Sequence, residues 1–310
     1  MAQSPTVGWG IVGCGRVADR RIAPVFAKTE DAALSAFCSR DLSKARAYCD
    51  RHGGRRAYGS LDDLLADDDV QIVYLATPNA LHAEQASRCL AAGKHVLVDK
   101  PLATDAQAAS SMVEAARTNG RLLGVMHQQR FHPANVHLIR LHDEGRLGKL
   151  NVLRVLLGMW YPLGPGESRT DPLRAEAPLP DPARHGPAPD NWRATPRLSG
   201  GGVVIDLAPH ALDLMLEVGG RIERVSAQTR NLQFSAPVED FCSARLEFAS
   251  GALGLVDLSY CAHHYGGRVE AYGSEATFAA DGSMQTAGVY CTWFRHGNTA
   301  EPMQQEVSTI

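Results

Sequence analysis

Apolar and polar positions alternate in two different rhythms along the 310-residue chain. In the first 125 residues, short runs rich in Val, Ile and Leu are separated by stretches in which Ala, Leu, Glu and Arg predominate, as in the βαβ units of a parallel sheet. We expect strands at 7–12, 33–38, 71–76, 95–98 and 122–125, and helices at 43–51, 81–92 and 105–118. The pattern predicts an N-terminal α/β Rossmann domain, with a doubly wound parallel sheet covered by helices on both faces.

The second rhythm begins near residue 126. Strands with alternating apolar residues follow one another at hairpin spacing, and we expect them at 150–157, 224–231, 240–248, 252–259, 268–272 and 290–294. They predict an α+β domain over residues 126–310 with a large, mainly antiparallel open sheet. One face of that sheet should pack on helices, which leaves the other face open to a partner subunit.

A glycine-rich turn follows the first expected strand. Gly13, Gly15 and Ala18 form a Gly-x-Gly-x-x-Ala pattern at the point where the strand should turn into a helix. Gly13 permits the tight turn, Gly15 lets a pyrophosphate approach the backbone, and Ala18 lets helix and strand pack closely. The pattern also occurs in other α/β proteins, but as the first element of a βαβ series it predicts a dinucleotide site that includes Arg16 and Val17.

The end of the second expected strand bears on the choice between the two nicotinamide dinucleotides. Proteins that bind NAD(H) usually place an Asp or Glu there, on the ribose 2′-hydroxyl. This chain has Ser39 and Arg40, which can bind a 2′-phosphate, and no carboxylate before Asp41. We therefore expect NADP(H) as the preferred cofactor, with NAD(H) possible. The alternative interpretation is an exposed arginine in a loop where Asp41 caps the next helix.

Further motifs occur in order along the chain: 76–82 (ATPNALH), 92–102 (AGKHVLVDKPL), 124–133 (GVMHQQRFHP), 191–193 (NWR) and 200–213 (GGGVVIDLAPHALD). With the glycine-rich turn, they resemble the glucose-fructose oxidoreductase/inositol dehydrogenase/MocA (Gfo/Idh/MocA) family over nearly the whole chain. The resemblance implies an oxidoreductase that moves a hydride between nicotinamide and a hydroxyl or keto carbon of a sugar, cyclitol or related small molecule. It assigns cofactor binding to residues 1–125, and substrate binding and oligomerisation to residues 126–310.

The resemblance also implies a catalytic set of Lys100, Asp206 and His210. Hydride transfer at a carbinol carbon requires a group that removes or supplies the hydroxyl proton, which fits these residue types. Asp206 and His210 are four residues apart and can share one face of a short helical segment. All three are expected to contact the substrate, and either Lys100 or His210 can be the proton donor.

Supporting contacts follow from the same resemblance. The cofactor is expected to contact Thr77, Pro78, Asn79, His82, Asp99, Lys100, Gln128, Trp192 and Arg193. The substrate is expected to contact His127 and Arg130 as well. Two positions depart from the family pattern: Asp99 stands where a glutamate is usual, and His127-Gln128-Gln129 replaces part of an aromatic-Asn-Arg-Arg string. The second departure changes the residues available for substrate contacts in the 127–130 segment.

Residues 161–190 contain eight prolines and several glycines and cannot form a regular element. They are either a disordered linker or an active-site flap, and we favour a flap because they lead into the candidate catalytic residues.

Other functions remain open at this point. Imine, dihydrodiol or tetrapyrrole reduction occurs on similar scaffolds. An NAD-dependent glycoside hydrolase of the same superfamily usually lacks the lysine that this chain has at Lys100. A non-catalytic NADP-sensing regulator should have a broken catalytic set, whereas Lys100, Asp206 and His210 are all present.

Composition excludes several classes of partner. A formal net charge of −3 without a basic run argues against nucleic acid, and no apolar stretch reaches the roughly 18 residues of a membrane span. Seven scattered cysteines and an N-terminus without a leader pattern predict a soluble, cytoplasmic protein with reduced thiols. No metal is expected, because the adjacent His263 and His264 point to opposite faces of a strand. The family resemblance implies a homodimer or homotetramer assembled through the C-terminal sheet.

Overall fold

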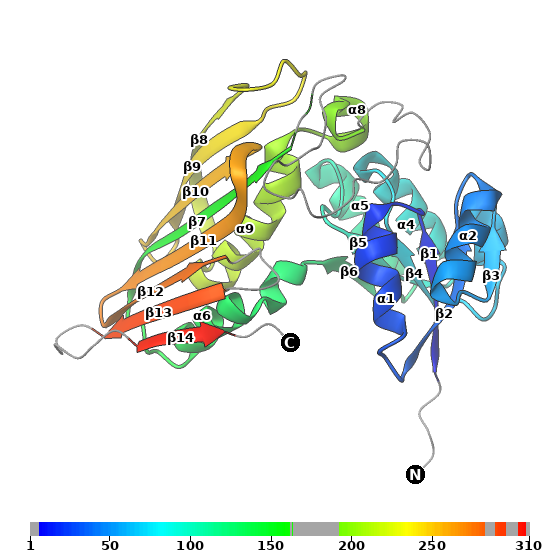
Figure 1. The fold of residues 1–310 in the computed structure, drawn as a ribbon, viewed down its shortest axis with the longest axis horizontal. Helices are drawn as coiled ribbons and strands as arrows, with labels where there is room; N and C mark the ends of the chain where they lie inside the picture. The colour runs from blue at the N-terminus through cyan, green and yellow to red at the C-terminus, as the bar shows by residue number, and fades with distance from the viewer. Residues whose placement is uncertain (1–5, 162, 164–191, 283–288, 296–302, 308–310) are drawn as a thin grey trace, which may run out of the picture. The chain divides into compact units, whose positions relative to one another are not determined.

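The computed structural model describes residues 6–161, 163, 192–282, 289–295 and 303–307. The chain forms two compact units, shown in Figure 1: unit 1 comprises residues 1–126 with 197–200, and unit 2 comprises residues 127–196 with 201–310. The chain therefore passes between the units three times. The proline-rich stretch expected to be a flap, 161–190, lies outside the described residues except for Tyr161 and Leu163.

Unit 1 contains a six-stranded sheet in which every pairing is parallel. Its order is β3-β2-β1-β4-β5-β6, so the strand sequence reverses direction between β1 and β4. The strands are β1 (Val7–Val12), β2 (Ala32–Cys38), β3 (Arg56–Tyr58), β4 (Ile72–Leu75), β5 (His95–Asp99) and β6 (Leu123–Met126). The predicted doubly wound parallel sheet is confirmed. In such sheets, ligands bind outside the carboxyl ends of the strands at the point of reversal.

Helices cover both faces of this sheet, as the pattern predicted. One apolar core lies under η1 (Ala18–Ile22), α1 (Ala23–Phe26) and α2 (Leu42–His52). The other lies under α3 (Leu61–Leu65), α4 (His82–Ala91) and α5 (Ala106–Thr118). A short 3-10 turn, η2 (Asn79–Leu81), leads into α4.

Unit 2 is built on an eight-stranded sheet in the order β14-β13-β12-β11-β7-β10-β9-β8. All its pairings are antiparallel except that of β7 with β10, which is parallel, so the expected mainly antiparallel open sheet is confirmed. The strands are β7 (Leu150–Trp160), β8 (Ile222–Arg230), β9 (Phe241–Phe248), β10 (Leu253–Ser259), β11 (Cys261–Gly273), β12 (Ala276–Asp281), β13 (Val289–Arg295) and β14 (Met303–Val307).

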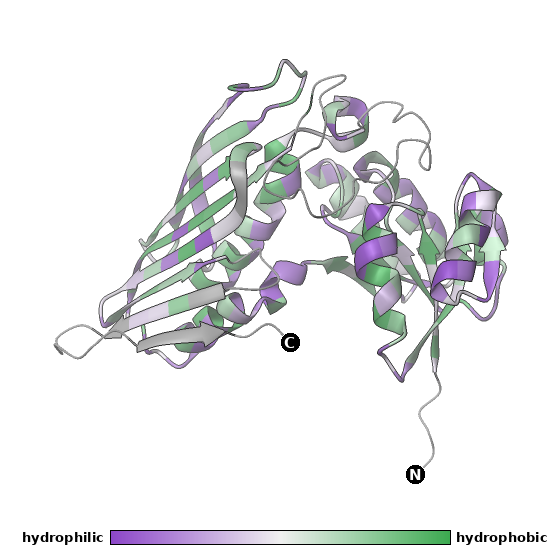
Figure 2. Ribbon diagram, in the orientation of Figure 1, coloured by the Kyte–Doolittle hydropathy of each residue, from purple (hydrophilic) through white to green (hydrophobic). Residues whose placement is uncertain are grey.

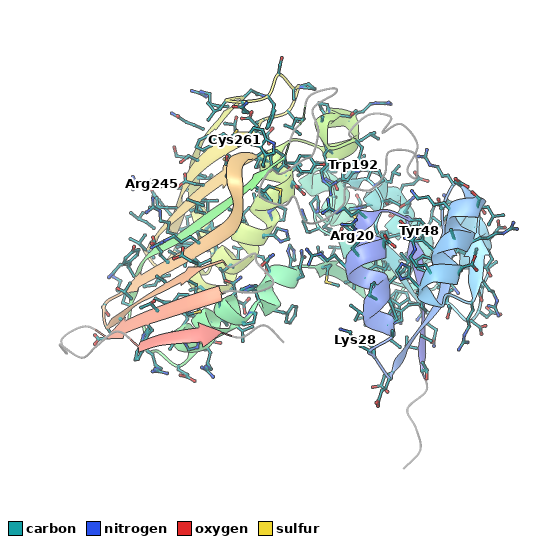
Figure 3. The ribbon with its side chains drawn as sticks, in the orientation of Figure 1. Arg20, Lys28, Tyr48, Trp192, Arg245 and Cys261 are labelled. Atoms are coloured by element: carbon teal, nitrogen blue, oxygen red, sulfur yellow. The ribbon has the colours of Figure 1, made fainter. Side chains whose placement is uncertain are left out.

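Two long helices, α6 (Pro133–Asp143) and α9 (Val203–Gly219), pack on one face of this sheet. The strands alternate accordingly: Leu153, Val155 and Leu157 of β7 are buried in the core, and Figure 2 shows the alternation of hydrophobic and hydrophilic residues along the strands. Arg245 of β9 projects from the opposite face (Figure 3). Shorter helical turns are η3 (Gln128–Phe131), η5 (Trp192–Ala194) and α8 (Pro196–Ser199).

Two further observations concern the described part of the chain. None of its helices combines the length and the apolar character needed to cross a bilayer. The seven cysteines are all described, and none forms a disulfide.

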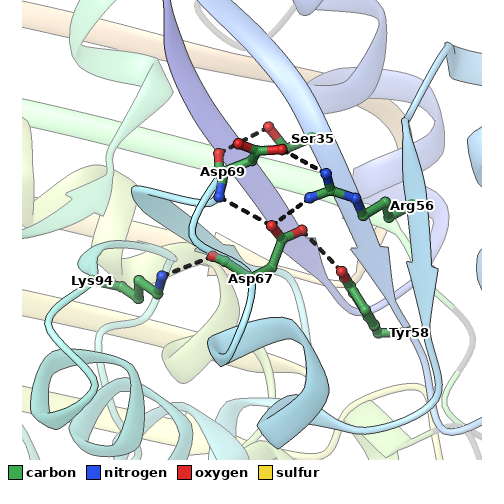
Figure 4. A network of polar contacts seen from close by, with 6 residues as sticks. All are labelled: Ser35, Arg56, Tyr58, Asp67, Asp69 and Lys94. Carbon is green, nitrogen blue, oxygen red and sulfur yellow. Dashed lines mark hydrogen bonds and ion pairs between the residues drawn. The ribbon is translucent and has the colours of Figure 1, made fainter.

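A polar network in unit 1 holds the loop between α3 and β4 (Figure 4). The buried carboxylate of Asp67 accepts hydrogen bonds from the Arg56 guanidinium, the Tyr58 hydroxyl at 2.9 Å and the Asp69 amide at 3.0 Å. The ammonium of Lys94, which is also buried, donates to the Asp67 carbonyl oxygen at 2.9 Å. Burial alone would raise the pKa of Asp67, but the hydrogen bonds outweigh it and hold the pKa below its usual value.

We predict that Asp67→Asn lowers the free energy of unfolding at pH 7 by about 1 to 3 kcal/mol, because it replaces one acceptor oxygen of a buried carboxylate by an amide NH2 that cannot accept from Arg56 or Tyr58. A lowered pKa means that the wild-type protein has this stabilisation above the ordinary Asp pKa of about 3.9 and loses it as pH falls through the folded value. The difference between variant and wild type should therefore shrink below about pH 4 in urea titrations. Asp68→Asn is the control: Asp68 is exposed, so this variant should change the free energy of unfolding little. Equal losses of stability in the two variants would contradict the prediction.

Candidate active site

The turn after β1 requires a glycine at its first position. Gly13 has a φ of +100°, and its amide donates to the Cys38 carbonyl oxygen at 2.9 Å. A Cβ on Gly13 would lie 2.6 Å from the Ala76 carbonyl oxygen, closer than any real Cβ contact. The close approach of β1, β2 and β4 therefore depends on the missing side chain.

The surroundings of Gly15 are open, whereas those of Gly13 are tightly packed. A Cβ on this residue would meet nothing within 4 Å, so the backbone there faces open space at the start of a helix. The exposed Arg16 and the half-buried Val17 begin that helix, and Ala18 is fully buried against the sheet. An accessible backbone at a helix N-terminus is what a pyrophosphate needs, so these residues fit a dinucleotide.

At the end of β2, Asp41 is the N-cap of α2. Its carboxylate accepts hydrogen bonds from the amides of Ser43 at 2.9 Å and Lys44 at 3.3 Å. Ser39 Oγ accepts from the Asp41 amide at 3.2 Å. Arg40 is exposed and forms no ion pair within the part of the chain that the structure describes. Because the Asp41 carboxylate accepts from the first amides of α2, Asp41 caps this helix, as the alternative interpretation predicted. The exposed Arg40 guanidinium is therefore available to a ligand.

The turn after β4 contains Thr77, Pro78 and Asn79, which were predicted to contact the cofactor. Asn79 is buried, and its side-chain amide donates to the Ser199 carbonyl oxygen at 2.8 Å. Ser199 belongs to the 197–200 segment of unit 1, and the next residue, Gly200, has a φ of +83° and lies close to Thr104. Asn79 thus fastens this returning segment of chain to unit 1. The Thr77 hydroxyl donates to Gln85 Oε1 at 2.6 Å.

His82 is only 1% exposed and lies behind this turn. Its Nδ1 is 2.9 Å from the Pro101 carbonyl oxygen and its Nε2 is 3.0 Å from the Thr77 carbonyl oxygen. Burial lowers the pKa of His82 more than the neighbouring carbonyl groups raise it. The described contacts of His82 therefore join the Thr77 turn to the Lys100-Pro101 turn, which differs from the predicted direct position against a ribose. An imidazole at full burial has no surface left for a ligand.

Lys100 follows the last residue of β5 and is half-buried. Its backbone amide donates to Asp99 Oδ1 at 3.0 Å, and the Lys100-Pro101 peptide bond is cis.

The Asp99 carboxylate also acts on Tyr74 of the neighbouring strand β4. Burial raises the pKa of Tyr74 above its usual value, and the Asp99 carboxylate raises it further. The carboxyl ends of β1, β2, β4 and β5 therefore carry the predicted cofactor residues of unit 1.

In unit 2, Asp206 lies in the first turn of α9. Its Oδ2 accepts a hydrogen bond from the Tyr260 hydroxyl at 2.7 Å, and its Oδ1 lies 3.8 Å from Nε of Arg193. Burial raises the pKa of Tyr260 well above its usual value, and the Asp206 carboxylate raises it further. The tyrosine therefore stays protonated and donates to Asp206, at a helix N-terminus that favours negative charge.

Arg193 lies over two aromatic rings. Its guanidinium carbon is 4.5 Å from the ring centre of Trp192 and 5.8 Å from that of Tyr161, and the Tyr161 and Tyr260 ring centres are 5.0 Å apart. Burial lowers the pKa of Arg193, but Tyr161 and Asp206 outweigh it, so the group stays charged. The structure thus brings together three predicted site residues, Trp192, Arg193 and Asp206; Trp192 is labelled in Figure 3.

Sequence reasoning missed Tyr260 and Tyr161. Tyr260 falls between β10 and β11, where an isolated aromatic residue has the pattern of an ordinary core residue. Nothing in its spacing distinguishes it, because the contact with Asp206 joins positions 54 residues apart.

The first turn of α9 is held by Glu239, which the sequence analysis also missed. The Glu239 carboxylate accepts from the amides of Gly202 and Val204, both at 3.0 Å, and the Val203 amide donates to the Glu239 carbonyl oxygen at 2.9 Å. These bonds satisfy amides that a helix N-terminus leaves without an intrahelical partner. His210, one turn after Asp206, is buried.

Arg130 was expected to contact the substrate, but its guanidinium is bound by α9. Its Nε and Nη2 lie 3.0 and 2.6 Å from the two carboxylate oxygens of Asp213, and its Nη1 lies 2.7 Å from Glu217. Such a bidentate pair fixes the guanidinium plane, so the observed role is to hold η3 on α9. His127, half-buried, and Gln128, exposed, precede it. In the described residues, no group of three or more His, Cys, Asp or Glu side chains is arranged to hold a metal ion.

Comparison with known families identifies both units. Residues 7–127 match the Gfo/Idh/MocA oxidoreductase family with its NAD-binding Rossmann fold, and residues 136–279 match the Gfo/Idh/MocA C-terminal domain. The chain belongs to the Gfo/Idh/MocA family. The matched ranges include Lys100, Asp206 and His210, and also Tyr260, but end before β13.

Individual Gfo/Idh/MocA relatives are similar over much of the chain. A 1,5-anhydro-D-fructose reductase from Ensifer adhaerens is 30% identical over 67% of this chain and 55% of the relative. A trans-1,2-dihydrobenzene-1,2-diol dehydrogenase from Bos taurus is 28% identical over 82% of this chain and 68% of the relative. The crystal structure of the WlbA dehydrogenase from Bordetella pertussis, in complex with NADH and UDP-GlcNAcA, is 26% identical, with a TM-score of 0.76 over 90% of this chain and 75% of that one.

The matches cover 62, 44 and 55% of the lengths of the first three curated relatives. The chain therefore spans about half the length of these curated relatives.

The two glycines of the Gfo/Idh/MocA dinucleotide turn give opposite predictions. Gly13→Ala should lower the free energy of unfolding by about 1 to 3 kcal/mol, because the backbone is left-handed there and a Cβ meets the Ala76 carbonyl. Gly15→Val should leave stability within about 0.5 kcal/mol of wild type but abolish dinucleotide binding, since its side chain fills open space. Urea unfolding and fluorescence titration with NADPH measure the two effects. Normal NADPH binding by a folded Gly15→Val protein would contradict the assignment of this turn.

Proposed function

We propose that this chain is an NADP-preferring oxidoreductase that transfers a hydride between nicotinamide and a hydroxyl or keto carbon of a sugar, cyclitol or related polyhydroxylated molecule. The observation that carries the proposal is the arrangement on α9. There the Asp206 carboxyl group accepts a hydrogen bond from Tyr260 and lies beside Arg193, one helical turn before the buried His210. A charged acceptor and an imidazole are suited to bind a carbinol hydroxyl and to exchange its proton.

Residues of unit 1 would hold the cofactor. The backbone at Gly15 and the helix that follows would bind the pyrophosphate, and the carboxyl end of β5 would bring Lys100 to the nicotinamide end. When bound, the nicotinamide supplies or accepts the hydride. Lys100 or His210 would take up or release the hydroxyl proton, while Asp206 would orient the hydroxyl group.

The preference for NADP(H) rests on the loop after β2. Arg40 is exposed there, and the neighbouring carboxylate of Asp41 is turned to the α2 amides, so it is not presented to a ribose 2′-hydroxyl. A guanidinium and a serine hydroxyl at this position favour a phosphate. The structure of the Bordetella pertussis relative contains NADH. The affinities of this chain for NADPH and for NADH should therefore be compared first.

The substrate class rests on the relatives together with the polar groups on α9. One relative reduces 1,5-anhydro-D-fructose by its name, and another is named for a trans-dihydrodiol. Both names describe a secondary carbinol or the ketone derived from it. A dihydrodiol is therefore the second candidate substrate, favoured by the aromatic rings of Trp192, Tyr161 and Tyr260 around Asp206 and Arg193.

Assembly through the C-terminal sheet is the remaining part of the proposal. The face opposite α9 carries exposed apolar side chains, including Leu156 of β7 and Tyr272 of β11, beside arginines such as Arg245. An open face of this composition is suited to a second copy of the chain in a homodimer or homotetramer.

Arg40→Ala tests the cofactor preference. Loss of a charge-assisted phosphate contact should weaken NADPH binding by about 1 to 3 kcal/mol, or about 5-fold to 150-fold, and leave NADH binding within about twofold. Fluorescence transfer from tryptophan to each dinucleotide measures both affinities. Arg46→Ala, which removes an exposed arginine from α2, is the charge control. Equal weakening of NADPH and NADH binding by Arg40→Ala would refute a 2′-phosphate contact.

Lys100→Ala tests the enzyme assignment itself. We expect turnover of keto-sugars or dihydrodiols to fall by at least about 100-fold, because a proton-transfer group is lost, while NADPH affinity stays largely intact. Lys28→Ala, at an exposed position, should behave as wild type. Unchanged turnover in Lys100→Ala would overturn the catalytic assignment. A wild-type protein that binds NADPH but turns over neither substrate class would favour a regulator.

A further inference from the structure

A small cavity lies behind His210, inside unit 2. It is lined by His210 and two other polar residues, Gln129 and Asn135, and otherwise by apolar side chains of β7, β11 and α9. His210 and Asn135 are 7% and 4% exposed, so the cavity is in the interior of the unit. Its size allows about one water molecule.

The orientation of the Asn135 side chain is fixed by the protein. Its amide nitrogen donates to the Gln129 carbonyl oxygen at 2.7 Å, which determines which side of the amide carries Oδ1. Asn135 Oδ1 and Gln129 Oε1 are both buried, and neither receives a hydrogen bond from any described residue. Two buried acceptors without donors are costly, by about 1 to 3 kcal/mol each, unless another molecule supplies the protons.

The chemistry of the lining identifies that molecule. It must donate two hydrogen bonds, one to each oxygen, and it must fit a space for about one water. Water satisfies both conditions, and a water that donates twice can still accept. The imidazole of His210 is the third polar group at the cavity and is the group able to donate to it.

We propose that a structural water bound by Asn135 and Gln129 accepts a hydrogen bond from Nδ1–H of His210 and so fixes the neutral imidazole as its Nδ1–H tautomer. Asn135 is then a positioning residue for His210. In this tautomer Nε2 carries the lone pair and can act as a proton acceptor on the side of the ring away from Nδ1. Because the water accepts and does not donate to the ring, the opposite tautomer would leave two lone pairs facing each other.

The consequence for catalysis rests on the function proposed above. If His210 exchanges a proton with a substrate hydroxyl, it does so through Nε2, and the water holds the ring ready in the acceptor form. The tautomer itself can be measured in the protein without any turnover, so this inference and the proposed function can fail separately.

Nitrogen-15 correlation spectra of the imidazole rings provide the first test. In wild-type protein at pH 8, with His210 assigned by comparison with His210→Asn, we expect the signals of a pure Nδ1–H tautomer. Asn135→Leu removes the acceptor and fills the cavity, and should give mixed tautomers. Leu214→Val, which changes an apolar wall of the same cavity, is the control and should keep the Nδ1–H form. An Nε2–H tautomer in wild type would overturn the proposal.

A crystal structure of the wild-type protein at high resolution provides a second readout that does not depend on any variant folding. Electron density for one water within hydrogen-bond distance of Asn135 Oδ1, Gln129 Oε1 and His210 Nδ1 is expected. A dry cavity, or a protein side chain in its place, would overturn the proposal.

Kinetics provide the third readout. Asn135→Leu should lower kcat by about tenfold to a hundredfold while KM and the NADPH affinity stay within about twofold, and Leu214→Val should leave all three nearly unchanged. Equal losses in both variants would indicate general damage to the core and would overturn a positioning role for Asn135.

Discussion

The amphipathic pattern of α9 is the constraint on which most of unit 2 depends. Val203, Leu207, Ala211, Leu214 and Val218 form a buried stripe at helical spacing that packs against the eight-stranded sheet. Burial of this stripe fixes the rotation of the helix about its axis. A second stripe at helical spacing, Asp206, His210, Asp213 and Glu217, consequently has its directions fixed too.

The members of that second stripe are engaged by three different parts of unit 2. Asp206 meets Tyr260 and Arg193, His210 borders the small cavity, and Asp213 with Glu217 binds Arg130. The Glu239 carboxylate fixes the axial position of the helix through its first amides. Pro209 lies inside the helix between the two candidate catalytic residues, and its missing N–H removes the backbone hydrogen bond to the Ile205 carbonyl oxygen. Packing of α9 against the sheet must therefore compensate for the free energy of the lost backbone hydrogen bond.

The sequence predicted those parts of the fold that periodicity specifies. The strands of unit 1 were found because parallel strands are continuous apolar runs, whereas β3, three residues long with an exposed arginine, has no such run. Similarly, the spacing of Asp206 and His210 placed them on one helix face. The partners of the site residues could not be predicted, because Tyr260, Glu239 and Asp213 are brought to their contacts by tertiary structure. Arg130, Asn79 and His82 show the converse: the family resemblance implied ligand contacts for them, and the structure shows protein partners that the sequence did not predict.

The return of residues 197–200 to unit 1 affects how the chain can be divided. A cut after residue 126 would yield a nucleotide-binding piece without Ser199, whose carbonyl oxygen is the acceptor for the buried amide of Asn79. The boundary in the sequence is therefore not the boundary in the structure. Recombination that exchanges unit 1 between family members at a single crossover would join an Asn79 turn from one parent to a 197–200 segment from another. The two segments, far apart in sequence, have to be inherited together.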